Sequence, residues 1–364
     1  MKEEMTSKER IEAALRGEPV DHPPFSPFLA YVWEFFPREV QEAGPLAFHR
    51  SIGADPLWRG APCPVSARPP AALKVSSWRE GDRDVTALET PVGTLRQATQ
   101  RSPDGNTSFL VEHPLKSAAD FKIQLWIEEH TTLVRDDSAM RAHFAGDGRE
   151  GLSLGMLIPR MKSAYQTMVE HLVGTEELIY AQADFPEAVE ELRQAMVAND
   201  LAAVRMAIDS DYEYFITWED SSTQNYSPAQ YDAFIGSEIG QWCALLQDAG
   251  KRYVQHACGH VAALVERMRD HGAYAIESIS PPPTGNITLA DARRIGGPAF
   301  GIIGGIEPVK FLRSTPRELE AYVGQVLRDG AGGPFLLANS DSCPPGVTVE
   351  KFRLVAETAR NWRN

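Results

Sequence analysis

Short apolar runs alternate with helix-like stretches along the second half of this 364-residue chain. The apolar runs lie at 152–158, 212–218, 252–255, 273–276, 299–303 and 334–338. Regular alternation of strand and helix is typical of a parallel sheet covered by helices. With further strands expected upstream, we predict an α/β fold in which the sheet closes into a (β/α)8 TIM barrel.

The first half predicts two additions to this barrel. An N-terminal helical extension occupies about 1–20, because Thr6–Glu9 reads as a capping box and Gly17 as a helix stop. After the prolines that follow, a first strand is expected at 25–28, and a β-hairpin excursion at about 76–113. A helix capped by Ser117 is predicted over 117–145. We expect one barrel domain over 1–364.

Charge and composition exclude several classes of protein. The formal net charge is −14 without long runs of one sign, which argues against nucleic acid or an anionic membrane as a partner. No apolar run is long enough for a transmembrane helix, and the N-terminus lacks the pattern of a signal peptide. Four cysteines in such a chain indicate a cytoplasmic protein with free or metal-bound thiols.

Polar and metal-competent side chains follow the predicted strands. In a βα barrel, functional side chains come from the C-terminal ends of the strands, which meet at one face. The residues that stand at these ends are Glu219, Asp220, His256, Cys258, Glu277, Glu307 and Cys343. The barrel prediction therefore makes residues that are distant in sequence into neighbours.

His256 and Cys258 are the strongest candidates for metal binding. Side chains two residues apart on a strand point to the same face, so both can hold one ion. Cys343, at the end of another strand and before the rigid Pro344-Pro345-Gly346 turn, supplies a third ligand. Three protein ligands and one open position are typical of catalytic zinc sites. We therefore predict a zinc site of His256, Cys258 and Cys343.

Glu277 and Asp220 are predicted as catalytic residues. Glu277 is expected either as a fourth oxygen ligand that substrate displaces or as an anchor for His256. Asp220, with its neighbours Glu219 and Trp218, is expected either to bind substrate or hydrogen-bond a ligand, or to form a strand-end salt bridge. His260 is expected to begin the following helix without a role in metal binding.

Gly304, Gly305 and Glu307 are predicted to bind a cofactor. The two glycines allow a ligand to approach the backbone closely, although the same pair can serve as a simple turn. No GxGxxG motif follows a first strand, which argues against a dinucleotide cofactor.

The zinc ligands indicate a type of chemistry. Two thiolates and one imidazole leave Zn²⁺ with little net charge, so an incoming thiol would lose its proton and stay nucleophilic. A methoxyl or alcohol oxygen at the open position would instead be activated as a leaving group. The ligand set therefore favours alkyl transfer over hydrolysis.

These motifs resemble the uroporphyrinogen decarboxylase-like superfamily, in its branch of zinc-dependent cobalamin methyltransferases of the methylcobalamin:coenzyme M type. The His-x-Cys pair with a distant Cys is the specific part of the resemblance. The segments that carry it are 6–24, 90–94, 113–117, 256–259, 304–308 and 339–345. The resemblance implies a (β/α)8 barrel and zinc bound by His256, Cys258 and Cys343. It also implies cobalamin carried by a separate corrinoid protein that docks over the barrel mouth.

The expected function is transfer of a methyl group between a small substrate and the cobalt of a corrinoid. The substrate is a thiol acceptor or an O- or N-methyl donor. One alternative is a tetrapyrrole decarboxylase, but 25–33 contains no arginine where uroporphyrinogen decarboxylases carry an arginine-rich segment. The other alternative is a zinc- or corrinoid-binding protein without turnover.

Overall fold

The structure is a computed structural model that describes residues 4–103 and 107–363. Contacts divide the chain into two compact units. The first unit comprises Met1–Pro64, Asp137–Leu157 and Ser210–Asn364, and the second comprises Val65–Asp136 and Ile158–Asp209. The single domain expected over 1–364 stays a prediction, because a division by contacts does not define what folds independently.

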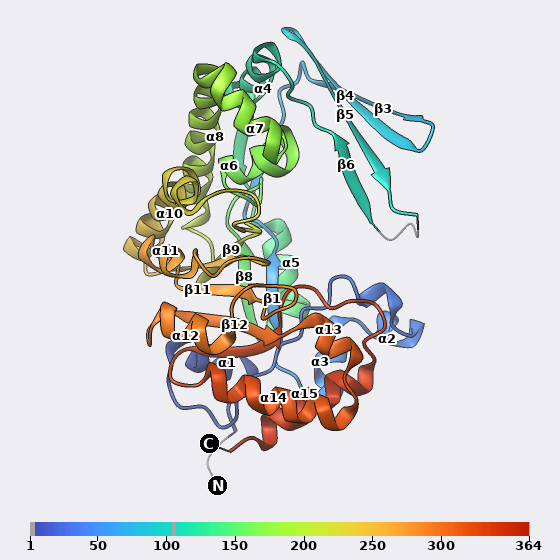
Figure 1. Cartoon of the computed structure of the whole chain (residues 1–364), viewed down its shortest axis with the longest axis vertical. Helices are drawn as coiled ribbons and strands as arrows, with labels where there is room; N and C mark the ends of the chain where they lie inside the picture. The colour runs from blue at the N-terminus through green and yellow to red at the C-terminus, as the bar shows by residue number, and fades with distance from the viewer. Residues whose placement is uncertain (1–3, 104–106, 364) are drawn as a thin grey trace. The chain divides into compact units, whose positions relative to one another are not determined.

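The first unit is built on a curled parallel sheet of seven strands, in the order β1-β8-β9-β10-β11-β12-β13 (Figure 1). Its strands are β1 (Leu57–Ala61), β8 (Leu152–Met156), β9 (Tyr214–Thr217), β10 (Arg252–His256), β11 (Ala275–Ile279), β12 (Gly301–Ile306) and β13 (Phe335–Asn339). All neighbouring pairs in this order are parallel. The α/β class and the parallel sheet are therefore confirmed.

The eight-stranded closure of the barrel is not confirmed. The strand expected at 25–28 is reduced to one bridge, between Phe25 and Leu337. There the Ser26 N–H donates to the Leu337 carbonyl at 3.0 Å, and the Asp55 N–H donates to the Phe25 carbonyl at 2.8 Å. Pro24 and Pro27 flank this bridge and have no N–H to donate, so a regular ladder cannot extend in either direction.

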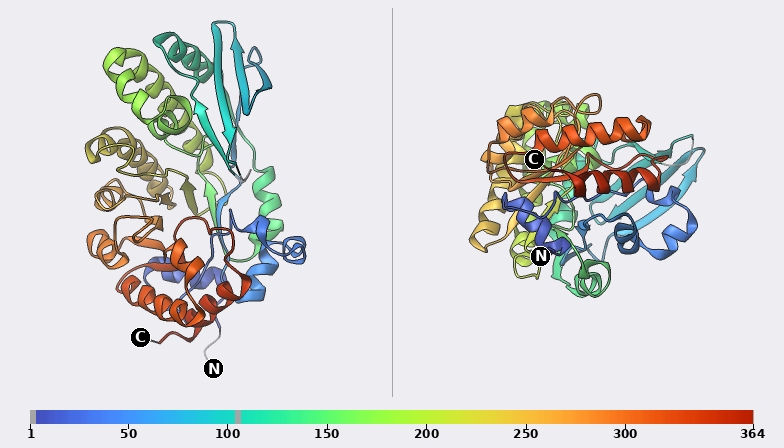
Figure 2. Two further views of the ribbon diagram at one scale, coloured as in Figure 1. Left: turned by 45° about the vertical axis from the view of Figure 1, so that its right-hand side comes forward. Right: turned by 90° about the horizontal axis from the view of Figure 1, so that it is seen from below.

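Helices and short helical turns connect the strands of the first unit. The helices are α1 (Ser7–Arg16), α2 (Arg38–Ala43), α3 (Pro45–Ile52), α5 (Ser138–Ala145), α9 (Pro228–Gln230), α10 (Ser237–Asp248), α11 (Val265–Asp270), α12 (Leu289–Gly296), α13 (Pro308–Arg313), α14 (Pro316–Gly330) and α15 (Val349–Asn361). A π-helical turn at Tyr231–Gly236 joins α9 to α10, and 3₁₀ turns lie at Trp33–Phe35 and Asp147–Arg149. α14 and α15 pack side by side (Figure 1 and Figure 2). Every helix in the described part of the chain is too short or too polar to span a bilayer.

The second unit combines antiparallel strands with helices. A four-stranded sheet, β3-β4-β5-β6, covers the region where a hairpin was expected, and β2 pairs with β7. The elements of this unit are β2 (Val65–Arg68), β3 (Lys74–Glu80), β4 (Arg83–Thr90), β5 (Gly93–Arg101), β6 (Ser108–Glu112), β7 (Thr132–Arg135), α4 (Ala118–His130), α6 (Ala164–Thr167), a π-helical turn (Met168–Leu172), α7 (Thr175–Asp184) and α8 (Pro186–Ala207).

The single helix predicted over 117–145 is wrong, although Ser117 does cap its beginning by accepting from the Asp120 N–H. The chain forms α4, then the strand β7, then α5. The run Thr131–Val134 explains the break, because β-branched side chains favour extended backbone over helix.

Apolar side chains from the strands and from α1 fill the core of the first unit. The buried members of this cluster are Ile11, Leu15, Leu57, Leu152, Leu154, Met156, Tyr214, Ile216, Val254, Ala275, Ile303, Leu336 and Ala338. The capping box of Thr6 and Glu9 begins α1, and Gly17, at φ 69°, ends it, as the sequence predicts. The core therefore packs α1 against the strands whose carboxyl ends carry the polar residues.

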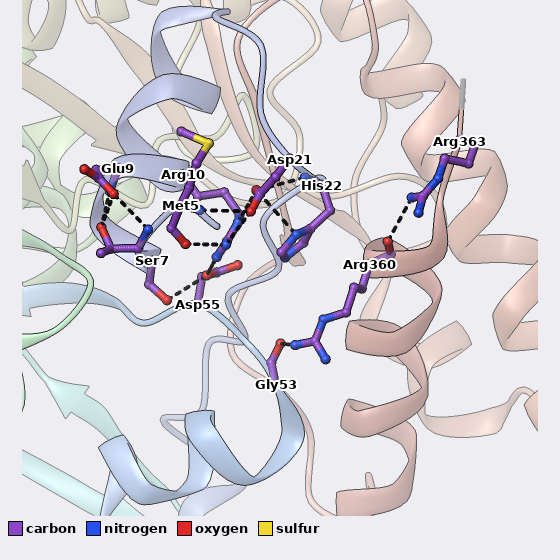
Figure 3. Close-up of polar contacts among 11 residues, drawn as sticks. Met5, Ser7, Glu9, Arg10, Asp21, His22, Gly53, Asp55, Arg360 and Arg363 are labelled. Atoms are coloured by element: carbon purple, nitrogen blue, oxygen red, sulfur yellow. Dashed lines mark hydrogen bonds and ion pairs between the residues drawn. The ribbon is translucent and has the colours of Figure 1, made fainter. Parts of the chain in front are cut away.

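Arg10 ties α1 to the segments that lead into the sheet (Figure 3). Its guanidinium donates to Asp21 Oδ1 at 2.6 Å, to Asp55 Oδ1 at 2.5 Å and to the Met5 carbonyl at 2.6 Å. The Ser7 hydroxyl also donates to Asp55, at 2.7 Å. The side chains of Arg10 and Asp55 are only 6% and 5% exposed, so neither charge is well solvated alone.

Arg10→Met should destabilise the protein. Removing one partner of a buried pair leaves an uncompensated charge, here on Asp55, which costs about 3 kcal/mol. Urea denaturation should show this loss. Arg16→Met should change stability by about 0.5 kcal/mol or less, because the side chain of Arg16, at the end of the same helix, is exposed and forms surface ion pairs with Glu12 and Glu18. Equal stability of the two variants would contradict the role of Arg10.

His49 on α3 should make stability depend on pH. Its Nδ1 lies 2.8 Å from the Pro45 carbonyl, and its Nε2 has no hydrogen-bond partner among the described residues. Burial lowers the pKa of His49 to about 4, so the folded protein resists protonation that the unfolded chain accepts near pH 6.5. The stabilisation is present above that pH and is lost as the pH falls toward 4.

His49→Phe should remove this dependence. Between pH 7 and pH 5 the free energy of unfolding should fall by about 2 kcal/mol more in the wild type than in the variant. The reason is that the pKa of His49 is lower in the folded state than in the unfolded chain. Denaturation curves at both pH values measure the difference directly. Identical pH profiles would show that His49 is not held neutral by the fold.

Candidate metal centre

Asp220, His256 and Cys258 form a cluster of possible metal ligands in the first unit. His256 is the last residue of β10, and Asp220 follows the adjacent strand β9. One ligand atom from each residue lies within 4.8 Å of the other two. His256 Nε2 is 3.1 Å from Asp220 Oδ1, and Cys258 Sγ is 3.6 Å from the same oxygen.

These separations fit a tetrahedral zinc ion. With metal–ligand bonds of about 2.0–2.3 Å, the ligand atoms around tetrahedral zinc lie about 3.3–3.7 Å apart. The distances from Asp220 Oδ1 to His256 and Cys258 are close to these values. Carboxylate, imidazole and thiolate are all ligands that zinc accepts. The residues present therefore suit this ion.

Glu277 and Arg59 fix the orientation of the His256 ring. Glu277 lies in β11, and its Oε2 is 2.5 Å from His256 Nδ1. The Arg59 Nε donates to Glu277 Oε1 at 2.7 Å, and the side chains of Arg59 and Glu277 are 2% and 0% exposed. Because Nδ1 is occupied, Nε2 is the nitrogen that faces Asp220 and Cys258. A carboxylate on the second nitrogen is the usual companion of a metal-binding histidine.

The charges of these groups are coupled. Burial lowers the pKa of His256, but its hydrogen bonds, chiefly to Asp220, outweigh burial and raise that pKa well above its usual value. Burial raises the pKa of Glu277, yet the charge of Arg59 and the bond to His256 bring it below its usual value. Burial raises the pKa of the Cys258 thiol. A cation bound here would replace the protons on His256 Nε2 and Cys258 Sγ.

Aromatic rings line one side of His256. The Trp218 ring meets the His256 ring edge-on with centroids 5.0 Å apart, and Phe28 does so at 6.4 Å. Phe28 also stacks on Trp218 at 5.7 Å. Gly60, at φ 67°, leaves the space that Trp218 occupies, since a Cβ there would lie 2.7 Å from the indole. These rings form an apolar wall beside the cluster.

Left-handed backbone conformations concentrate at this site. Among the described residues, the non-glycine residues with positive φ are Asp220, Ser278, Asp341 and Met161. Asp220 belongs to the cluster, and Ser278 follows Glu277 directly. Such conformations cost about 1–3 kcal/mol each and are typical of functional sites.

Asp341, two residues after the end of β13, interacts electrostatically with the cluster. The charge of His256 acts on Asp341, and the charge of Asp341 acts on Cys258. Asn339 donates to the Asp341 carbonyl at 2.8 Å and stabilises a turn in which Asp341 has φ 61°. Burial raises the pKa of Asp341 above its usual value.

Cys343 lies outside the cluster of possible ligands among the described residues. Its thiol is fully buried, and its N–H donates to the Phe28 carbonyl at 3.2 Å. Burial raises the pKa of this thiol, as it does that of Cys258. The structure brings Asp220 close to His256 and Cys258, and the role of Cys343 as the third zinc ligand stays a prediction.

Gly304, Gly305 and Glu307 have structural tasks. Both glycines lie in β12 at positive φ, where Cβ atoms would come within 3.1 Å of Ile279 and 2.7 Å of Val326. Glu307 caps α13 by accepting from the Lys310 N–H, and it also accepts from the Thr284 hydroxyl. These contacts explain the residues by packing and capping, and their cofactor-binding role stays a prediction.

Arg59 was not predicted from the sequence, and the prediction that His260 begins a helix is wrong. Arg59 is a charged residue inside the short apolar run 56–61, which was a signal for a buried partner. His260 does not begin a helix, because it lies on the loop before α11, where its carbonyl accepts from the Thr223 N–H at 2.9 Å.

Comparison with known proteins identifies related chains. The family model described as Uroporphyrinogen decarboxylase (URO-D) matches residues 165–362, more than half of the chain. A methyltransferase from Methanosarcina mazei has a TM-score of 0.63 and 14% identity, over 98% of this chain and 98% of its own. A B12-independent methionine synthase from Shewanella sp. W3-18-1 has a TM-score of 0.44 and 10% identity, over 93% and 97%. No curated protein sequence matches the chain.

Single substitutions should separate the two possible ligand sets. Wild-type protein should retain about one zinc ion per chain after dialysis, as expected for one catalytic site. Cys258→Ser and Asp220→Asn should weaken zinc binding at least about 10-fold. Cys343→Ser should retain zinc, as should the control Cys63→Ser, because Cys63 is a half-buried cysteine of this unit outside the cluster. Elemental analysis gives the occupancy. Loss of zinc in Cys343→Ser with retention in Asp220→Asn would show that two thiolates hold the ion.

Proposed function

This chain belongs to the uroporphyrinogen decarboxylase (URO-D) family, and we propose that it is a zinc-dependent methyltransferase. The methyl group moves between a small substrate and the cobalt of a corrinoid, which a partner protein carries. The cluster of Asp220, His256 and Cys258, with Nδ1 of the histidine held by Glu277, is the observation that supports this proposal. It stands at the carboxyl ends of parallel strands, where catalytic groups of such sheets gather.

The summed charge of the three proposed zinc ligands suits alkyl transfer. One thiolate, one carboxylate and a neutral imidazole balance the charge of Zn²⁺, as the predicted pair of thiolates would. Zinc supplies Lewis acidity at the open position, where a substrate thiol loses its proton readily or a methyl-bearing heteroatom becomes a better leaving group. Replacing a thiolate by the harder oxygen of Asp220 suits oxygen and nitrogen substrates as well as thiols.

The other residues bind and orient. Glu277 keeps His256 Nδ1 occupied and leaves Nε2 for the ion. Phe28 and Trp218 cover one side of the histidine and keep water from that side. A dry wall strengthens the electrostatic interactions of the charged groups beside it. The same wall offers an apolar surface to the carbon-rich part of a methylated substrate.

Arg59 argues against decarboxylation of a tetrapyrrole. That reaction needs cationic side chains that are available to the carboxylates of the substrate. The guanidinium of Arg59 is buried and bound to Glu277, with further donation to the Ser26 carbonyl at 3.1 Å. Because these partners inside the protein already occupy the guanidinium, it does not bind a substrate carboxylate.

Cobalamin spectroscopy tests the proposal. Zinc-loaded protein should demethylate methylcobalamin in the presence of a thiol from a small panel, or methylate Co(I)alamin from a methoxy or N-methyl compound. Both reactions change the visible spectrum of the corrin. Cys258→Ser should lower the rate by about 100-fold or more, from loss of a metal ligand.

The controls separate the alternatives. Cys63→Ser should react like the wild type. No spectral change with any donor or acceptor, in protein that holds zinc, would favour a binding protein without turnover. Release of carbon dioxide from uroporphyrinogen would instead support the decarboxylase alternative.

A further inference from the structure

We propose that Arg59 is a positioning residue for His256 and acts through Glu277. This inference rests on the proposed function only in naming zinc as the ion. Arg59 Nε binds one oxygen of Glu277, at 2.7 Å, and His256 Nδ1 binds the other, at 2.5 Å. The three side chains form a continuous buried chain that ends at Nε2, the atom that faces Asp220 and Cys258.

Arg59 is held independently of His256. Its Nη2 donates to the Ser26 carbonyl at 3.1 Å, and its Nη1 lies 3.5 Å from the carbonyls of Pro27 and Leu57. Its guanidinium also lies over the Phe28 ring, 5.3 Å from the centroid. These contacts come from β1 and the segment before it, so they hold the guanidinium in place without any contribution from Glu277.

The inner side of the sheet brings Arg59 to Glu277. β1 stands at one end of the strand order and β11 is separated from it by β8, β9 and β10. The two side chains therefore meet across the concave side of the sheet and not along a ladder. With an exposed fraction of 0%, Glu277 has no solvent to stabilise its charge and depends on Arg59.

This arrangement selects between the two roles expected for Glu277. A carboxylate whose two oxygens are bound by Arg59 and His256 is an anchor for the histidine. Without Arg59, Oε1 would lose its hydrogen-bond donor, and the carboxylate would be free to rotate away from His256 or turn toward the ion. Either change would weaken the bond that orients the His256 ring.

Zinc affinity should respond to Arg59. Arg59→Met keeps much of the side-chain length and removes the charge, and it should weaken zinc binding about 10-fold in competition with a chelator. Arg59→Lys should recover most of this loss. Arg293→Met is the control, because Arg293 is buried in the same unit but donates to the carbonyls of Phe300 and Pro334. Zinc affinity in Arg59→Met equal to or tighter than that of the control would overturn the proposal.

A double-mutant cycle tests whether Arg59 acts through Glu277. Glu277→Gln alone should weaken zinc binding, and adding Arg59→Met should cause little further loss. Residues that act in one network are not additive, whereas independent effects add. Additive losses would show that Arg59 supports the site in some other way and would overturn the proposal.

A measurement on metal-free protein keeps the inference separate from the proposed function. Proton NMR of ¹⁵N-histidine-labelled protein should show a strongly downfield proton between His256 Nδ1 and Glu277, absent from His256→Gln. It should move upfield or broaden in Arg59→Met and stay in place in Arg293→Met. An unmoved resonance in Arg59→Met would overturn the positioning role. Failure of wild-type protein to bind zinc, with this resonance behaving as expected, would refute the proposed function alone.

Discussion

His256 presents Nε2 to Asp220 and Cys258 because Nδ1 is occupied by Glu277, and the candidate site depends on this bond. Glu277 and Arg59 are almost completely buried, so their charges have lost the stabilisation that water provides. Buried ion pairs often contribute little to stability, because desolvation offsets their attraction. A chain of three buried ionisable groups is therefore better explained by the orientation of His256 than by folding energy.

The residues around this bond give the site two different sides. Phe28 and Trp218 make one side of the His256 ring apolar, while the Asp220 carboxylate lies 3.1 Å from Nε2. The charge of Asp341 also acts on Cys258, and both aspartates have left-handed backbone conformations. A cation that binds imidazole, thiolate and carboxylate would neutralise the repulsion between the acidic groups. The same balance of charge underlies the proposed transfer of a methyl group.

Sequence patterns could predict the parallel strands and the pair His256 and Cys258, because both follow from local periodicity. The proximity of Asp220 could not be predicted in this way, because it depends on how the loop after β9 folds, where Asp220 has φ 46°. The role of Cys343 stays a prediction, since its place after β13 depends on a turn in which Asp341 has φ 61°. Arg59 was missed because its partner is Glu277, far away in sequence and across the sheet. The strand expected at 25–28 is reduced to one bridge, because Pro24 and Pro27 have no N–H to donate to a ladder.

X-ray absorption at the zinc edge tests the central claim most directly, because it counts the sulfur atoms bound to the ion. We expect one sulfur at about 2.3 Å, from Cys258, and nitrogen or oxygen atoms at about 2.0–2.2 Å, from His256 and Asp220. Two sulfur atoms at about 2.3 Å would indicate a second cysteine ligand, Cys343. That result would contradict the ligand set derived from the structure.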